Sequence, residues 1–176
     1  MTRYFDASAL VKRYVREVGS ATVRRLLASA IPASSRLSEV EVSSGIVRRT
    51  REGAFTTRRR DRMLAALRRD LPALAIVEMI PEITAAARAL LLRHPLRAGD
   101  AIQLASCLYL QQQLAQPVPF VAFDRRLVEA AHAEGLTVIT APGNPHRKPA
   151  KTVRMPRKSP RHRPRYRGIR ITSVVR

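Results

Sequence analysis

Short apolar runs alternate with longer segments of helical periodicity along the first 140 residues of the chain. The runs are predicted to be strands, at residues 2–5, 31–35, 75–80, 119–123 and 136–140. They are apolar throughout instead of alternating with polar residues, which is typical of strands that are covered on both faces. The pattern therefore favours a sheet in the interior of the protein.

The segments between these strands predict helices, at residues 9–14, 19–30, 37–51, 56–71, 83–93, 100–114 and 125–134. Strands that alternate with helices indicate the α/β class, with a mainly parallel sheet and helices on both faces. The segment 100–114 is apolar on nearly every side, so this helix is expected to lie in the core.

The composition supports a packed, aliphatic core, since 45% of the residues are hydrophobic while only 5% are aromatic and none is Trp. Cys107 is the only cysteine, which excludes an internal disulfide and a cysteine-based zinc site. We expect it to be a buried thiol. No apolar run is long enough to span a membrane, and charges interrupt the N-terminal apolar segment. A cytoplasmic protein without membrane contact is expected.

Positive charge is concentrated near the C-terminus. The chain has 33 Lys and Arg against 13 Asp and Glu, a net charge of +20, and residues 146–176 contain 12 of the basic residues and no acid. We therefore expect a folded domain at residues 1–145 and a disordered, Pro- and Arg-rich tail at residues 146–176. Such charge favours a nucleic-acid partner; solubility and a tail without function are the alternatives.

Three acids stand where a strand is expected to lead into a helix. Asp6 follows the first predicted strand, Asp124 follows the fourth, and Asp100 opens the predicted core helix. Each could simply cap its helix. Together they indicate more, because the carboxyl ends of parallel strands meet at one edge of the sheet, where open α/β folds bind ligands. Carboxylates gathered there repel one another, and a divalent cation relieves that repulsion.

Two glutamates of the helix at residues 37–51 compete to be a fourth ligand. Glu39 and Glu41 are two positions apart, so they face nearly opposite ways on a helix. Glu41 shares its face with small and apolar residues and is predicted to point inward, whereas Glu39 points to solvent. An inward Glu41 that pairs with an arginine is the alternative.

Four segments of the chain resemble the motifs of the PIN-domain family, especially those of the VapC-like toxins of bacterial toxin–antitoxin pairs. The matching segments occur in the expected order, at residues 5–12 (FDASALVK), 38–42 (SEVEV), 96–105 (LRAGDAIQLA) and 120–127 (FVAFDRRL). Ala7 and Ala122 stand where the family often has a hydroxyl residue, and the tail has no counterpart in the family.

The resemblance implies a PIN-like three-layer fold, with a short-stranded central sheet, and a Mg²⁺- or Mn²⁺-dependent cleavage of RNA. It implies four residues that both bind the metal and take part in catalysis: Asp6, Glu41, Asp100 and Asp124. Ser8 and Arg97 are candidates for contact with RNA phosphates. A cap at Ser8 and an ion pair at Arg97 are the simpler alternatives.

The family further implies a small antitoxin protein as partner, and we also expect a homodimer. The apolar helical segments 11–14 and 23–27 are candidates for the surface that receives the antitoxin or a second copy, unless they only pack into the core. Two other functions stay open: a non-catalytic nucleic-acid-binding protein with a degenerate PIN fold, and a role confined to protein interaction.

Overall fold

A computed structural model describes residues 1–140 of the 176-residue chain. Both the predicted tail, residues 146–176, and the predicted domain boundary at residue 145 lie outside the described residues, so these two expectations stay predictions. The fold described below is that of the N-terminal part.

The sheet has five short parallel strands in the order β3-β2-β1-β4-β5. Their bounds are β1 (Thr2–Phe5), β2 (Ile31–Ser35), β3 (Ala75–Val77), β4 (Phe120–Val121) and β5 (Val138–Ile139). The predicted α/β class and the parallel sheet are confirmed. The third, fourth and fifth strands are shorter than predicted, because apolar residues beyond the paired segments pack without entering the sheet.

The helices are α1 (Ala7–Tyr14), α2 (Ser20–Ala28), α3 (Leu37–Arg51), α4 (Thr57–Asp70), a 3-10 turn η1 (Leu71–Ala73), α5 (Pro81–Arg93), α6 (Ala98–Leu114) and α7 (Arg125–Ala133). The start of α6 corrects one expectation. Asp100 does not open the helix; Arg97 is its N-cap, and Asp100 lies in the first turn. A carboxylate there still interacts favourably with the helix dipole.

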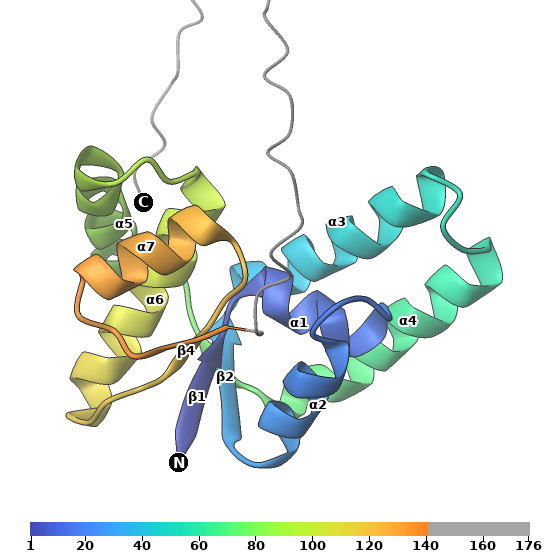
Figure 1. Ribbon diagram of the computed structural model, residues 1–176, viewed down its shortest axis with the longest axis horizontal. Coiled ribbons are helices and arrows are strands. Elements are labelled where there is room, and N and C mark those ends of the chain that lie inside the picture. Colours follow the sequence, from blue (N-terminus) through green and yellow to red (C-terminus); the bar gives the residue numbers. More distant parts are fainter. Residues whose placement is uncertain (141–176) are drawn as a thin grey trace, which may run out of the picture. The chain divides into compact units, whose positions relative to one another are not determined.

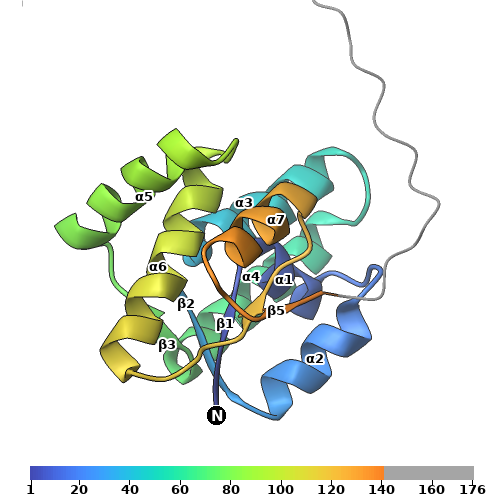
Figure 2. The ribbon, with the colours of Figure 1, turned by 60° about the vertical axis from the view of Figure 1, so that its left-hand side comes forward.

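Two groups of helices cover the two faces of the sheet, as Figures 1 and 2 show: α5, α6 and α7 lie on one face, and α1, α2, α3 and α4 on the other. Each face has its own apolar core. Because strand side chains alternate between the faces, Tyr4 belongs to the first core and its neighbour Phe5 to the second. The three-layer arrangement that the sequence predicted is confirmed.

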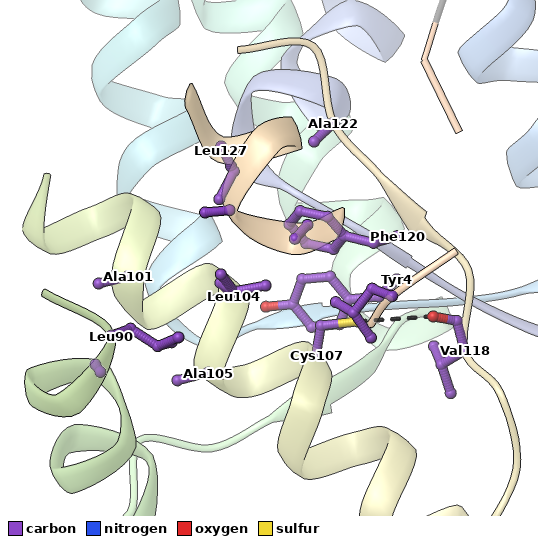
Figure 3. Close-up of a cluster of buried hydrophobic side chains, with 14 of the residues drawn as sticks. Tyr4, Leu90, Ala101, Leu104, Ala105, Cys107, Val118, Phe120, Ala122 and Leu127 are labelled. Atoms are coloured by element: carbon purple, nitrogen blue, oxygen red, sulfur yellow. Dashed lines mark hydrogen bonds between the residues drawn. The ribbon is translucent and has the colours of Figure 1, made fainter. Parts of the chain in front are cut away.

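Figure 3 shows the first core, in which α6 packs against β1 and β4. The rings of Tyr4 and Phe120 lie 5.6 Å apart, and the thiol of Cys107 contacts the Val118 carbonyl oxygen at 3.8 Å. Cys107 is fully buried, and burial raises the pKa of its thiol well above the usual value. The predicted structural role of this cysteine fits both observations. Within residues 1–140, no helix has the length and apolar character needed to cross a membrane.

Candidate acidic active site

Asp6 stands at the point where β1 ends and α1 begins. Its backbone N–H donates to the Val121 carbonyl at 3.1 Å, which fixes it beside β4 at the carboxyl edge of the sheet. Its side chain caps α1 by accepting a bond of 3.1 Å from the Ser8 backbone N–H, and it also accepts from the Ser8 hydroxyl. Asp6 is only 4% exposed, so it is a buried carboxylate.

Glu41 reaches the same region from the second turn of α3. Its Oε2 accepts a bond of 2.7 Å from the Gln103 side-chain amide on α6. A Cβ on Gly99 would displace Glu41 Oε1, so the glycine leaves room for this carboxylate to lie against the start of α6. Glu39, by contrast, has a side chain that is 44% exposed and pairs with Arg36 at 3.5 Å.

A buried hydrogen-bond network, which the sequence analysis missed, holds Glu41 in place. The Tyr4 hydroxyl donates to Gln103 Oε1 at 2.8 Å, and the Gln103 amide nitrogen donates to Ser38 Oγ at 2.8 Å as well as to Glu41. Since the Tyr4 bond fixes the orientation of the Gln103 amide, both N–H groups of that amide are directed at α3. The signal in the sequence was a glutamine among the mostly apolar residues of the predicted core helix.

Asp100 occupies the first turn of α6, one residue beyond Gly99. Its Oδ2 accepts a bond of 3.2 Å from the Arg97 backbone N–H, which orients the carboxylate at the N-terminus of the helix. The side chain is partly exposed. Asp100 therefore lies next to the glycine that Glu41 contacts.

The three carboxylates interact electrostatically. Burial raises the pKa of Asp6 to about 6, its bonds to Ser8 oppose the shift, and the charges of Glu41 and Asp100 add to it. Burial also raises the pKa of Glu41, partly offset by Gln103 and reinforced by the charge of Asp100. Asp6, Glu41 and Asp100 thus form one set of mutually repelling acids, which we call the acidic triad.

No member of the acidic triad has an ion pair with any residue that the structure describes, although basic residues greatly outnumber acids in this chain. The alternative that Glu41 pairs with an arginine is therefore not what the structure has; a neutral amide takes that place. Buried carboxylates without a cation are costly, and they are typical of functional sites.

The chemistry of the acidic triad fits a hard divalent ion such as Mg²⁺, which takes oxygen ligands and keeps several of its waters. The triad is not drawn together around one point: within residues 1–140, no three acidic, His or Cys side chains are close enough to hold one ion directly. An ion at this site would therefore be bound by some of these carboxylates directly and by others through water.

Asp124 lies at the same edge of the sheet, three residues beyond β4, but its surroundings differ. Its Oδ1 caps α7 by accepting bonds from the backbone N–H groups of Arg126 and Leu127, at 3.0 and 3.2 Å. The Arg126 guanidinium lies 3.8 Å away, and the Asp124 side chain is 43% exposed. The structure thus gives Asp124 a capping role, and its place in metal binding stays a prediction.

The side chains of the two candidates for phosphate contact, Ser8 and Arg97, are not equally free to bind a ligand. The hydroxyl of Ser8 donates to Asp6, and the N-cap of α1 is Asp6 and not Ser8. Arg97 is exposed at the N-terminus of α6, and its guanidinium has no ion pair among residues 1–140. Of the two, Arg97 is better placed to meet a phosphate near the acidic triad.

A parallel α/β sheet with carboxylates gathered at its carboxyl edge places this protein among the open α/β proteins, which bind ligands at that edge. The family comparison is specific within that class, because the PIN domain matches residues 3–133. The chain belongs to the PIN domain family.

Two similar relatives are ribonucleases of Mycobacterium tuberculosis, VapC45 of strain CDC 1551 / Oshkosh and VapC49 of strain ATCC 25618 / H37Rv. Each is 36% identical over 148 residues, which cover 81% of this chain and 97% of the relative. The chain thus spans nearly the whole length of both relatives.

Solved structures share the fold at lower identity. The toxin–antitoxin complex from Klebsiella pneumoniae is similar with a TM-score of 0.54 at 18% identity, over 79% of this chain and 97% of that one. VapBC2 from Rickettsia felis, bound to a DNA fragment from its promoter, is similar with a TM-score of 0.57 at 12% identity. The match covers 80% of this chain and 98% of that one. Identities this low support the fold alone.

Proposed function

We propose that this chain is a metal-dependent endoribonuclease, and that it is the toxin of a toxin–antitoxin pair. The acidic triad carries the proposal: three carboxylates from three separate elements lie near one another at the ligand-binding edge of the sheet, without a basic partner among residues 1–140. The relatives named as ribonucleases supply the substrate class, which is RNA.

The acidic triad would hold Mg²⁺, or Mn²⁺ in its place, with Asp124 completing the set. When bound, the ion would polarise the scissile phosphate and activate a water for attack. The residues of the chain do the positioning. Ser8 orients Asp6, and Gln103 orients Glu41, each through hydrogen bonds to the carboxylate. Arg97, exposed at the start of α6, would attract the RNA phosphate.

A partner surface is proposed at the helices that cover the second face of the sheet. A groove of about 310 Å³ lies between α1, α2 and α4, with apolar walls that include Leu10, Leu27 and Leu74 and a rim that includes Arg13 and Arg24. We infer that a segment of the antitoxin occupies it. Only some of the residues predicted for this surface line the groove. Leu27 lines it, whereas Val23 is fully buried in the core. The homodimer stays a prediction.

The test of the nuclease is cleavage of a labelled RNA by the purified full chain, with Mg²⁺, with Mn²⁺ and with a chelator. We expect cleavage only when the metal is present, and none by Asp100→Asn. A single-stranded DNA of the same length is the comparison substrate and should survive. Tight RNA binding without metal-dependent cleavage would instead support the non-catalytic alternative.

The toxin role has a separate test. Expression of the chain alone should slow bacterial growth, while expression of Asp100→Asn should not. Co-expression with the small protein encoded by the neighbouring reading frame should restore growth. Normal growth with abundant folded wild-type protein would contradict the toxin role. The ribonuclease activity would still be decided by the cleavage assay.

A further inference from the structure

The far end of α3 carries a second concentration of charge, opposite in sign to the acidic triad. Residues 48–62 contain seven arginines and two acids, a net charge of +5, while residues 1–145 as a whole contain 21 basic and 13 acidic residues, a net charge of +8. Most of the excess positive charge outside the tail therefore lies in this segment, which we call the arginine tip.

The arginine tip is the turn of a helical hairpin. Figure 1 shows α3 and α4 as two neighbouring helices whose connection lies far from the strands. Gly53 allows the reversal with a positive φ of 77°, and the Thr56 hydroxyl caps α4 by accepting from the Arg59 N–H at 3.3 Å. The tip is thus an ordered projection.

Most of the arginines at the tip are free to meet a ligand. Five of them are exposed and have no ion pair among the described residues: Arg48, Arg51, Arg58, Arg59 and Arg62. The other two serve the fold, since Arg49 pairs with Glu17 and Arg60 pairs with Asp61. Unpaired like charges at this density repel one another, and a polyanion relieves that repulsion.

The geometry of α3 connects the arginine tip to the acidic triad. Arg48 follows Glu41 by seven residues, which is two turns, so both side chains leave the same face of the helix about 10 Å apart along its axis. Of the positions between them on this face, Ser44 is small and exposed, while Gly45 faces the Val11 side chain of α1. An extended polyanion that follows α3 from the triad to the tip would therefore pass over Ser44, beside α1; the face ends at Glu52.

We propose that the arginine tip binds the phosphodiester backbone of single-stranded RNA, as a site separate from the acidic triad that holds the substrate along α3. The inference rests on the proposed nuclease function and adds to it the path that the RNA follows. Arginine suits this task, because its planar guanidinium makes paired hydrogen bonds to phosphate oxygens.

A protein partner fits the arginine tip less well. Protein interfaces are organised around buried apolar or aromatic anchors. None of the large hydrophobic side chains that the structure exposes falls between residues 41 and 78, and Phe55 is half-buried, with the guanidinium of Arg59 5.6 Å from its ring centre. A surface with charge and no apolar anchor is typical of backbone binding in nucleic-acid complexes.

The test compares two double variants of the full-length protein that remove the same charge. R58Q/R62Q neutralises two exposed arginines four residues apart on one face of α4, while R25Q/R88Q neutralises two exposed arginines away from the tip, on α2 and α5. Binding of a fluorescent oligouridine is measured in a chelator over a range of salt concentrations, and a DNA strand of the same length is measured beside it.

We expect R58Q/R62Q to bind RNA more weakly and to flatten the dependence of log K on log salt by roughly 1.4, since each lost phosphate contact contributes about 0.7 for a single strand. R25Q/R88Q should keep the wild-type slope. Equal slopes for both variants, a loss confined to DNA, or a loss confined to a protein partner would each overturn the proposal.

The same variants separate this inference from the nuclease itself. If the wild type cleaves RNA and R58Q/R62Q binds RNA as well as the control variant does, the proposed RNA site at the tip is wrong and the proposed nuclease function is supported. If neither the wild type nor any variant cleaves RNA and only R58Q/R62Q loses RNA affinity, the RNA site is supported and the nuclease function is wrong. Thermal unfolding of both variants verifies that they are folded, which neutral changes at exposed positions should permit.

Discussion

Two groups of acids in this protein have opposite electrostatic surroundings, and Glu134 and Asp6 represent them. Glu134, at the end of α7, accepts a bond of 2.6 Å from His94 and is paired with Arg93 at 3.0 Å, and these partners lower its pKa. Asp6, at the start of α1, has a side chain whose one hydrogen-bond partner among residues 1–140 is Ser8, and burial beside Glu41 and Asp100 raises its pKa to about 6. The first arrangement stabilises the fold, whereas the second costs stability.

The difference shows where function resides. A protein so rich in arginine has no shortage of counter-charges, and it provides them to Glu17, Glu78 and Glu134. The acidic triad is left without one among residues 1–140, which keeps its carboxylates available for a cation. Glu134 ties the end of α7 to the end of α5, so its role is structural.

The largest expected effect is on cleavage. Asp6→Asn should lower the rate of RNA cleavage by more than about 100-fold, because the loss of a metal ligand should exceed the 10- to 100-fold cost typical of its supporting residues. Glu134→Gln is the matched control, also a loss of one carboxylate, and should cleave at the wild-type rate when folded. An equal loss of cleavage in both variants would mean that the acidic triad and the ion-paired acids do not differ in function.

The next effect is on stability without metal. Between about pH 4 and pH 6 the folded protein holds the Asp6 proton that the unfolded chain has released, so the free energy of unfolding falls as pH rises through this window. A shift from 3.8 to about 6 corresponds to about 3 kcal/mol.

Asp6→Asn should remove that decline, since asparagine caps a helix as well as aspartate does. Denaturant unfolding in a chelator should therefore find the variant more stable than wild type above about pH 7, and the gap should close below about pH 4. A variant that is less stable than wild type at neutral pH would mean that the charge of Asp6 is already compensated in the fold.

Glu134→Gln should have the opposite and smaller effect. The change removes a charge that His94 and Arg93 stabilise, and a partly exposed pair of this kind contributes on the order of 1 kcal/mol. Because the folded pKa of Glu134 is lowered, its contribution is present above the unfolded pKa and lost as pH falls through the folded one. The stability deficit of the variant should therefore vanish in acid.

The smallest effect is expected at Glu39. Its half-exposed side chain has one pair, with Arg36 at 3.5 Å, so Glu39→Gln should change the free energy of unfolding by less than about 0.5 kcal/mol and leave cleavage intact. Glu41→Gln, two residues further along α3, should abolish cleavage. If both variants lost activity alike, the assignment of the inward-facing glutamate would be wrong.

The sequence by itself determined the order of strands and helices and most of their bounds. Short apolar runs and helical periodicity are local properties, and the chain has both clearly from Thr2 to Ile139. Asp6 and Asp124 could also be placed at the edge of the sheet, since each directly follows a predicted strand. Local patterns were less reliable at helix starts, where capping competes: α6 begins at Ala98, with Asp100 inside its first turn.

Only the tertiary structure decided what surrounds the acids. The bond that holds Glu41 comes from Gln103, 62 residues away, and exists because α6 packs against α3. The capping bonds of Asp124 and its contact with Arg126, by contrast, are local, and they fit the simpler alternative that the sequence left open. Whether a carboxylate is repelled or paired depends on which elements pack beside it, and no local pattern of residues specifies that packing.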